Sequence, residues 1–154
     1  MKDRLEKKAH LIMMFAGLLN VAVLPVWRLP IARAMARAIG YPLFGVGLAL
    51  NLLSLLALRR GFGGEIEPVT ELVTDGIYAR LRHPMYVSFA ITMLGLDVLL
   101  GSVLGVLFTA LAFLPSMVWR AGLEERALDR RFGQAWKDYV GSAPSLLLWD
   151  LRKT

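Results

Sequence analysis

Residues that could do acid-base or ligand-binding chemistry gather in two stretches of the chain. The first, Arg59 to His83, contains four acids and ends in a cluster of tyrosine, arginine and histidine. The second, Arg120 to Val140, carries the adjacent carboxylates of Glu124 and Glu125. Such groups can transfer protons or hold the charged parts of a bound molecule. Ordinary roles stay open, because His83 could cap a helix and the glutamates could lie on a solvated helix face.

The composition excludes several other chemistries. The chain has no cysteine, which removes disulfides, thiolate metal sites and cysteine nucleophiles. Its two histidines, His10 and His83, are too few for an ordinary zinc centre, so we expect no metal. The segment Gly61-Phe62-Gly63-Gly64 has Ile66 where a dinucleotide-binding loop has its third glycine, and no strand precedes it. A Rossmann-type site is therefore not expected.

The chain is too apolar for a water-soluble monomer. Of its 154 residues, 56% are hydrophobic and 19% are charged, and the mean hydropathy is +0.55. About 20 apolar residues are needed to cross roughly 30 Å of hydrocarbon. Charge-free runs of this length predict membrane spans at about 9–27 and 38–58.

A third apolar run, 84–119, is long enough for two spans. Its 36 residues contain one charged residue, Asp97, and as one helix they would extend about 54 Å. We therefore expect a tight hairpin of spans 84–100 and 103–119 that turns at Gly101-Ser102. Asp97 would lie one turn from the tip, close to an interface or lining a polar cavity.

The basic residues indicate the orientation of four such spans. Alternating sides would carry 15 and 3 Lys and Arg residues. By the positive-inside rule, both termini and the 59–83 loop are cytoplasmic. The formal charge of +6 is then explained by topology, and nucleic acid is not expected as a partner. We expect a retained first helix rather than a signal peptide, in a bacterial or archaeal inner membrane.

The fold class that follows is an all-α polytopic membrane protein with one domain, 1–154. After the fourth span, apolar residues recur at the spacing of one helical stripe: Leu123, Leu128, Phe132, Trp136 and Tyr139. The opposite face is charged, which predicts a C-terminal amphipathic helix on the cytoplasmic side. In the second span, Gly45, Gly47 and Ala49 predict a close helix approach, and Asn51 predicts an interhelical hydrogen bond.

The order of the motifs resembles the isoprenylcysteine carboxyl methyltransferase family. The matching elements cover 72–148: Gly76-Ile77-Tyr78, Arg82-His83-Pro84-Met85-Tyr86, the hydrophobic hairpin, Glu124-Glu125-x-x-Leu128, Phe132-Gly133, Tyr139 and Pro144. This family and the related phosphatidylethanolamine N-methyltransferases are membrane enzymes that use S-adenosylmethionine. The resemblance implies the same cofactor here, in a cytosol-facing region formed by 59–83 and 120–148.

Particular site residues follow from the resemblance. It implies that the cofactor is held by His83, Tyr86, Glu124 and Glu125, with Tyr78 and Arg82 as further positions. It also implies that Glu125, His83 and Arg82 serve the reaction. S-adenosylmethionine carries an ammonium, a sulfonium, hydroxyls and a carboxylate, so it calls for both acids and hydrogen-bond donors. Arg82 or His83 suits the carboxylate, and the glutamates suit the ammonium or hydroxyls.

The chain departs from the family near its end. Prenylcysteine methyltransferases place arginines before the proline of the last motif, whereas 140–143 here is Val-Gly-Ser-Ala, and Trp136 replaces a tyrosine. We expect an integral membrane methyltransferase for a lipid-like or prenylated acceptor, with phospholipid N-methylation as the alternative. Two other classes stay open: an NADPH-dependent enzyme similar to sterol reductases, and a non-enzymatic helical membrane protein that packs against a partner.

Overall fold

The computed structural model describes residues 30–61 and 71–143, together with positions 11, 12, 15, 17 and 19. Within these ranges every regular element is a helix: α2 (Arg33–Gly61), α3 (Pro84–Leu100), α4 (Val103–Phe108), the π-helix η1 (Thr109–Phe113), α5 (Leu114–Phe132) and α6 (Gln134–Ser142). The all-α class is confirmed for this part of the chain. Most of the predicted first span, 9–27, lies outside the described residues, as do 62–70 and 144–154.

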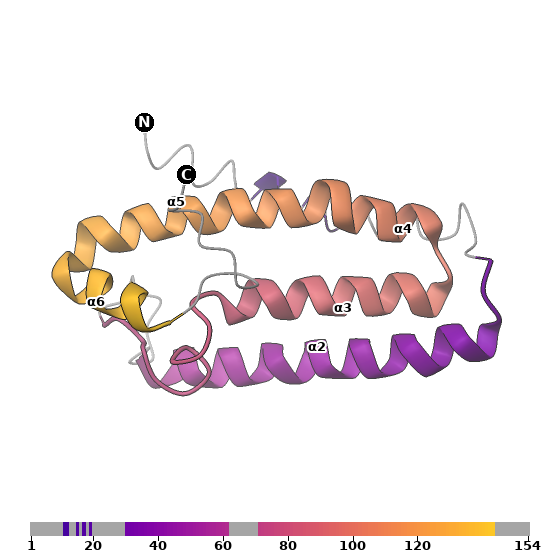
Figure 1. Ribbon diagram of the computed structural model, residues 1–154, viewed down its shortest axis with the longest axis horizontal. Helices are drawn as coiled ribbons and strands as arrows, with labels where there is room; N and C mark the ends of the chain where they lie inside the picture. The colour runs from indigo at the N-terminus through magenta and orange to yellow at the C-terminus, as the bar shows by residue number, and fades with distance from the viewer. Residues whose placement is uncertain are drawn as a thin grey trace.

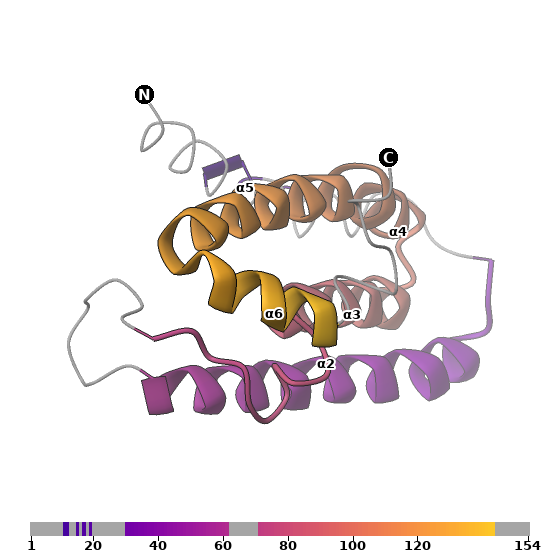
Figure 2. The same cartoon turned by 60° about the vertical axis from the view of Figure 1, so that its left-hand side comes forward.

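Three long helical rods run side by side, with α3 in the middle (Figure 1). α2 lies along one side of α3, and the continuous rod α4–η1–α5 lies along the other. α6 folds back at the end of α5 and lies near the segment 71–83 (Figure 2). The two ends of the molecule therefore differ: one combines the start of α3 with α6, and the other combines the start of α2 with the α3–α4 turn.

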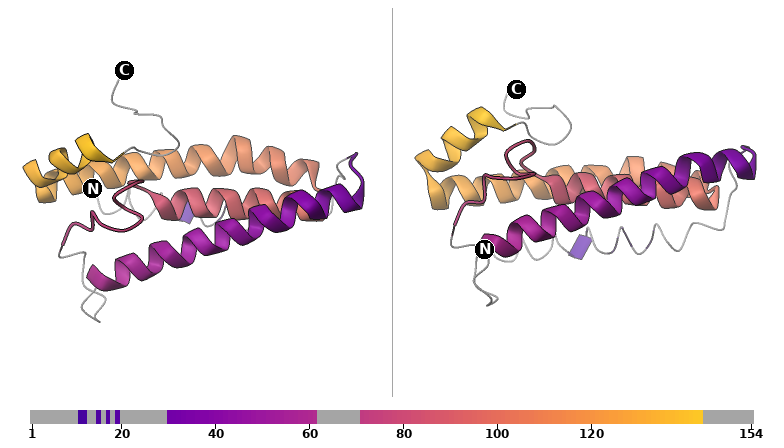
Figure 3. Two further views of the ribbon diagram at one scale, coloured as in Figure 1. Left: turned by 60° about the horizontal axis from the view of Figure 1, so that its bottom comes forward. Right: turned by 90° about the horizontal axis from the view of Figure 1, so that it is seen from below.

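The contact between α2 and α3 depends on glycines. A Cβ at Gly95 would lie 2.5 Å from the backbone nitrogen of Phe44, and one at Gly40 would lie 2.6 Å from Leu99. Gly47 meets the backbone of Thr92 in the same way, as predicted, but Gly45 faces open space. Figure 3 shows the two helices crossing at a shallow angle along this seam. The predicted interhelical hydrogen bond is present, with Asn51 Nδ2 donating to Ser88 Oγ at 3.1 Å.

The chain reverses between α3 and α4 at Gly101 and Ser102. Gly101 adopts a left-handed conformation with φ of 64°, which glycine reaches without steric cost. Ser102 caps α4 by accepting a hydrogen bond from the backbone N–H of Gly105 at 2.9 Å. Asp97 lies one turn before this tip, as predicted, and is not among the residues lining the two described cavities. It is fully buried and accepts a hydrogen bond from Thr109 Oγ1 at 2.6 Å.

The rod from Val103 to Phe132 changes helix type around Pro115. Proline has no N–H and its ring clashes with the carbonyl four residues earlier, and the π-helical turn η1 immediately before it accommodates this mismatch. The amphipathic helix expected over 120–140 is divided in the structure. Its first half continues α5, and the chain then breaks at Gly133, which has φ of 54° and separates α5 from α6.

Two helices in the described part are long and apolar enough to cross a membrane. They are Arg33–Leu58 and Val103–Phe132, while Pro84–Leu100 is apolar but only 17 residues long. α2 keeps much of its apolar surface exposed, with Leu52 at 57%, and Leu111 of η1 is 74% exposed. Such faces are costly in water and ordinary in lipid. The helices therefore favour an integral membrane protein.

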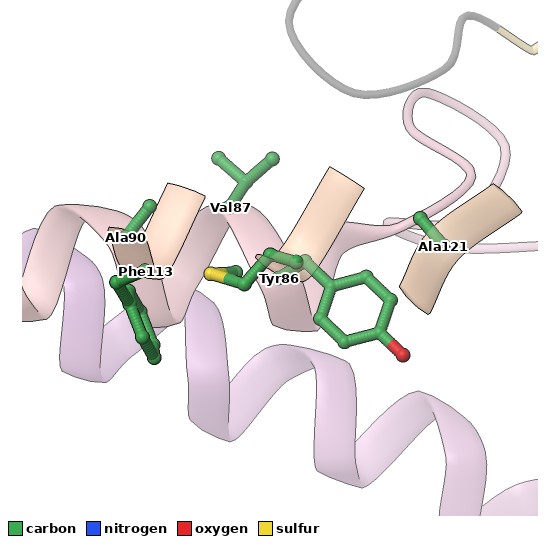
Figure 4. Close-up of a cluster of buried hydrophobic side chains, with 6 residues drawn as sticks. Tyr86, Val87, Ala90, Phe113 and Ala121 are labelled. Atoms are coloured by element: carbon green, nitrogen blue, oxygen red, sulfur yellow. The ribbon is translucent and has the colours of Figure 1, made fainter. Parts of the chain in front are cut away.

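A compact apolar cluster joins α3 to the η1–α5 rod. It contains Tyr86, Val87 and Ala90 from α3, and Phe113, Met117 and Ala121 from η1 and α5 (Figure 4). Met117 has no exposed surface. This packing fixes the first turns of α3 beside the middle of α5, so residues just before α3 lie next to residues just after Ala121.

Candidate functional site

The residues before α3 are turned inward by local backbone features. Gly76 adopts φ of 57°, which allows the turn at 75–80, and Pro84 occupies the first position of α3, where no N–H is needed. His83 occupies the N-cap position, but its side chain makes no capping hydrogen bond. Arg82 and His83 are each only 5% exposed. Their side chains are therefore committed to contacts inside the protein.

Both of these side chains bind the same carboxylate of α5. Arg82 Nη1 donates to Glu125 Oε1 at 2.9 Å, and His83 Nε2 lies 3.2 Å from the same oxygen. Removing two charges from water is costly, and a pair with direct hydrogen bonds offsets much of that cost. This contact links residues 43 apart in sequence, and it ties the loop before α3 to α5.

The neighbouring carboxylate, Glu124, has a different environment. Tyr86 Oη donates to Glu124 Oε2 at 2.8 Å, and His83 Nδ1 lies 4.0 Å from that oxygen. The Glu124 side chain is 45% exposed, whereas that of Glu125 is 14% exposed. Adjacent positions on a helix point about 100° apart, so one glutamate faces inward and the other faces a partly open space.

That space is a cavity of about 490 Å³. Its lining combines a few polar groups with a larger apolar surface: Leu58, Leu72, Val73, Tyr78, Arg82, His83, Met85, Tyr86, Phe89, Arg120, Glu124, Leu128, Trp136 and Tyr139. Five of the six predicted site residues are among them. The sixth, Glu125, is not a lining residue but contacts two lining residues, Arg82 and His83. The size and the mixture of polar and apolar walls are typical of small-molecule sites.

α6 closes one side of this cavity with two aromatic residues. Tyr139 Oη donates to the backbone carbonyl of Tyr78 at 2.7 Å, which attaches α6 to the segment before α3. Trp136 packs against Tyr139 with ring centroids 5.6 Å apart and is 1% exposed. Among the residues that the structure describes, the buried Nε1–H of Trp136 has no hydrogen-bond acceptor, and a buried donor left unpaired costs about 1–3 kcal/mol. A bound molecule that offered an acceptor would recover part of that cost.

The phenols of this region stay protonated at neutral pH. Burial, followed by the nearby carboxylate of Glu124, raises the pKa of Tyr78 above its ordinary value. Burial is also the main reason why the pKa of Tyr139 rises to about 12; the Arg82 guanidinium opposes this shift. Both side chains therefore act as hydrogen-bond donors rather than as proton acceptors.

Nine of the fourteen lining residues were not among the predicted site residues, and Arg120 and Leu58 show two different reasons. Arg120 lies one helical turn before Glu124, so the i,i+4 spacing could have placed both on one face of α5. Leu58 comes from α2, and no sequence signal linked α2 to the site. Among the described residues, no group of three or more His, Cys, Asp or Glu side chains could hold a metal ion.

The chemistry of the lining fits S-adenosylmethionine. The carboxylate of Glu124 suits an ammonium group or ribose hydroxyls, and the guanidinium of Arg120 or Arg82 suits a carboxylate. Tyr86 and Trp136 contribute aromatic rings to the lining, and aromatic rings suit both an adenine ring and a sulfonium cation. The cavity therefore offers a partner for each chemical part of this cofactor.

Comparison with known proteins places these features in a family. The sequence model of the phospholipid methyltransferase family matches residues 35–135, about two thirds of the chain. Protein-S-isoprenylcysteine O-methyltransferase of Schizosaccharomyces pombe is 42% identical over 74 residues, which cover 48% of this chain and 31% of that protein. Protein-S-isoprenylcysteine O-methyltransferase B of Arabidopsis thaliana is 32% identical over 75 residues, covering 49% and 38% respectively.

The chain thus spans about a third of the length of these two relatives. Both come from eukaryotes and lend no support to the expected bacterial or archaeal origin. No solved structure matches the chain. The family match includes α2 from Met35 onward, all of α3 and the whole Arg82–His83–Glu125 contact, and the resemblance drawn from the motifs is confirmed. The chain belongs to the phospholipid methyltransferase family.

Proposed function

We propose that the chain is an integral membrane methyltransferase that uses S-adenosylmethionine and acts on a lipid-like or prenylated acceptor. The observation that carries this proposal is one juxtaposition. Arg82, His83 and Tyr86 at the start of α3 contact Glu124 and Glu125 of α5 beside a largely apolar cavity, which all of them except Glu125 line. The family membership and the names of the two relatives support a methyl-transfer reaction.

The two glutamates have separate roles in this proposal. Glu124 lines the cavity, and its carboxylate contacts the ammonium or the hydroxyl groups of the cofactor. Glu125 acts as a positioning residue, because its carboxylate fixes Arg82 and His83 and does not line the cavity. The sequence-based prediction had placed both glutamates in contact with the cofactor, and the geometry favours only Glu124.

When bound, S-adenosylmethionine supplies a methyl group that its sulfonium charge activates for displacement. The residues of the chain provide position and electrostatics. Tyr86, held by its hydrogen bond to Glu124, lies at the cavity wall, and the apolar lining around Phe89 and Leu128 excludes water. Holding reactants in a productive geometry contributes up to about 7–11 kcal/mol in the best cases.

The identity of the acceptor determines whether a base is needed. A carboxylate acceptor is already ionised and needs none, whereas a lipid amine must lose a proton, for which Glu124 or His83 is the candidate. Arg120 gives the cavity a cation suited to an acidic acceptor head, although the family's arginines are missing from 140–143. We favour a lipid-like or prenylated acid and keep the phospholipid amine as the alternative.

The acceptor tail enters from the bilayer in this proposal. Leu58 of α2 and Met85 and Phe89 of α3 line the side of the cavity formed by the apolar helices. We further propose four membrane spans, at about 9–27, 38–58, 84–100 and 103–119, with both termini cytoplasmic. The distribution of Lys and Arg supports this orientation, and it places the cavity at the cytoplasmic boundary.

Calorimetric titration with S-adenosylhomocysteine tests the proposal. Detergent-purified wild type is expected to bind it saturably, whereas Glu124→Gln and His83→Ala bind it at least about tenfold more weakly. Asp138→Asn is the matched control, because Asp138 is an exposed carboxylate on α6 that does not line the cavity. A folded wild type that does not bind S-adenosylhomocysteine would contradict the proposal. The same titration with NADPH tests the reductase-like alternative.

A further inference from the structure

A second cavity lies at the end of the molecule opposite the candidate site. Its volume is about 370 Å³, and its walls come from the start of α2 with the residues just before it and from the end of α3 with the following turn: Ile31, Arg33, Ala36, Arg37, Leu99, Leu100 and Gly101. In Figure 1 this is the end where α2 begins and where α3 turns into α4. None of these residues belongs to the cavity beside Glu124.

The polar part of this second cavity is purely cationic. Arg33 and Arg37 are one helical turn apart and line the same space, so both guanidinium groups can reach one anion. Residues 30–61 and 98–119 contain no Asp or Glu. Asp97 is close in sequence, but it is fully buried and hydrogen-bonded to Thr109. The described part of the chain therefore supplies no carboxylate to neutralise this pair.

The remaining lining of the cavity is apolar, and its base lies where α2 packs closely against α3. Ala36 is 5% exposed, and below it Gly40 packs directly against Leu99, which closes the base between the two helices. Leu100 is 53% exposed and continues the apolar surface outward. A free inorganic anion would gain nothing from these walls, whereas a molecule with an anionic head and a hydrocarbon tail would contact both parts.

We propose that this cavity binds the phosphodiester head group of an anionic phospholipid. Arg33 and Arg37 hold the phosphate, and an acyl chain lies along Leu99 and Leu100. The ends of two apolar helices, α2 and α3, meet here, which places the guanidinium groups at the depth of lipid head groups. This lipid site is separate from the proposed methyl-transfer reaction and does not depend on it.

The test measures lipid binding to the detergent-purified full chain. We expect phosphatidylglycerol, but neither phosphatidylcholine nor inorganic phosphate, to stay bound in native mass spectrometry and to raise the Tm by roughly 2–5 °C. The double variant Arg33→Gln/Arg37→Gln is expected to bind phosphatidylglycerol about tenfold more weakly. Its affinity for S-adenosylhomocysteine should equal that of wild type.

The matched control is Arg126→Gln/Arg130→Gln, an exposed arginine pair with the same spacing on α5 that lines neither cavity. It should retain phosphatidylglycerol. Equal losses in the two double variants would overturn the proposal in favour of general charge attraction. An equal effect of inorganic phosphate would overturn the lipid assignment. If the glutamine variant fails to fold, the variant Arg33→Lys/Arg37→Lys keeps both positive charges but removes the planar guanidinium groups. An unchanged lipid affinity in this lysine variant would also overturn the proposed phosphate contact.

Discussion

The two ends of the pair formed by α3 and the α4–η1–α5 rod both bury polar side chains, but they do so in different ways. At the turn, Asp97 and Thr109 are each fully buried, and their hydrogen bond links residues only 12 apart. At the other end, Arg82 and His83 contact a carboxylate more than 40 residues away and line a cavity of about 490 Å³. The polar contact at the turn lines no described cavity, whereas the one at the start of α3 does.

This difference is what distinguishes a structural polar contact from the ligand-binding role that we propose for the start of α3. A buried polar group must be satisfied wherever it lies, so burial and hydrogen bonding alone do not mark a functional site. The start of α3 differs because its oriented hydrogen-bond donors and acceptors line a cavity that a ligand can enter. Variants at the two ends should therefore differ in which property they lose, and they test the comparison directly.

The largest effect is expected at Glu125. Glu125→Ala leaves the buried Arg82 without its carboxylate partner, which costs about 3–5 kcal/mol of stability, and S-adenosylhomocysteine binding is lost because Arg82 and His83 are no longer held in place. Chemical unfolding in detergent and calorimetric titration measure the two losses. Glu125→Gln, which keeps one hydrogen-bond acceptor, should fall between wild type and alanine. A Glu125→Ala protein with normal stability and binding would remove the positioning role.

A smaller and more selective effect is expected at Glu124. Its side chain is 45% exposed, so Glu124→Gln should change the free energy of unfolding by less than about 1 kcal/mol, while affinity for S-adenosylhomocysteine falls about tenfold. The ratio of the affinity loss to the stability loss is the measured quantity. If Glu124→Gln and Glu125→Gln gave the same ratio, the division of roles between the two glutamates would be wrong.

Much of this arrangement could be predicted from the sequence. The bounds of α3 agree with the predicted segment 84–100. The chain also reverses at Gly101-Ser102, where these two residues interrupt the apolar run. The grouping of Arg82, His83 and the glutamates followed from a resemblance of ordered motifs. These features depend on local chemistry or on short patterns, which a sequence displays directly.

Other features depend on packing between distant segments and were not predictable. Which of two adjacent glutamates faces the cavity is set by the rotation of α5, and that rotation is fixed by Met117 and Ala121 in the apolar cluster with α3. The partner of Asp97 depends on the π-helical turn that places Thr109 beside it. The break at Gly133 was missed because the apolar stripe continues through it from Leu128 to Trp136.

A variant at the turn end provides the contrast to both glutamates. Thr109→Val keeps the shape of the side chain but removes a hydrogen-bond donor of Asp97, which should cost about 1–2 kcal/mol of stability. Affinity for S-adenosylhomocysteine should remain that of wild type, since the turn lies at the far end of α3. Unfolding and titration on the same preparation separate the two properties. Weakened binding in Thr109→Val would show that the two ends are coupled through α3.

The smallest effect concerns the hydrogen bond that attaches α6 to the candidate site. Tyr139→Phe removes its donor to the Tyr78 carbonyl, and we expect a loss of about 1 kcal/mol of stability at neutral pH.

The pKa of Tyr139 rises from 10.0 to about 12 in the folded protein. Between these values the unfolded chain loses the phenolic proton and the folded chain keeps it, so wild-type stability falls as pH rises from 10 toward 12. Tyr139→Phe should flatten that alkaline decline, as measured by denaturant unfolding at a series of pH values. An unchanged slope would show that another group, such as Tyr78 with its own raised pKa, accounts for the decline.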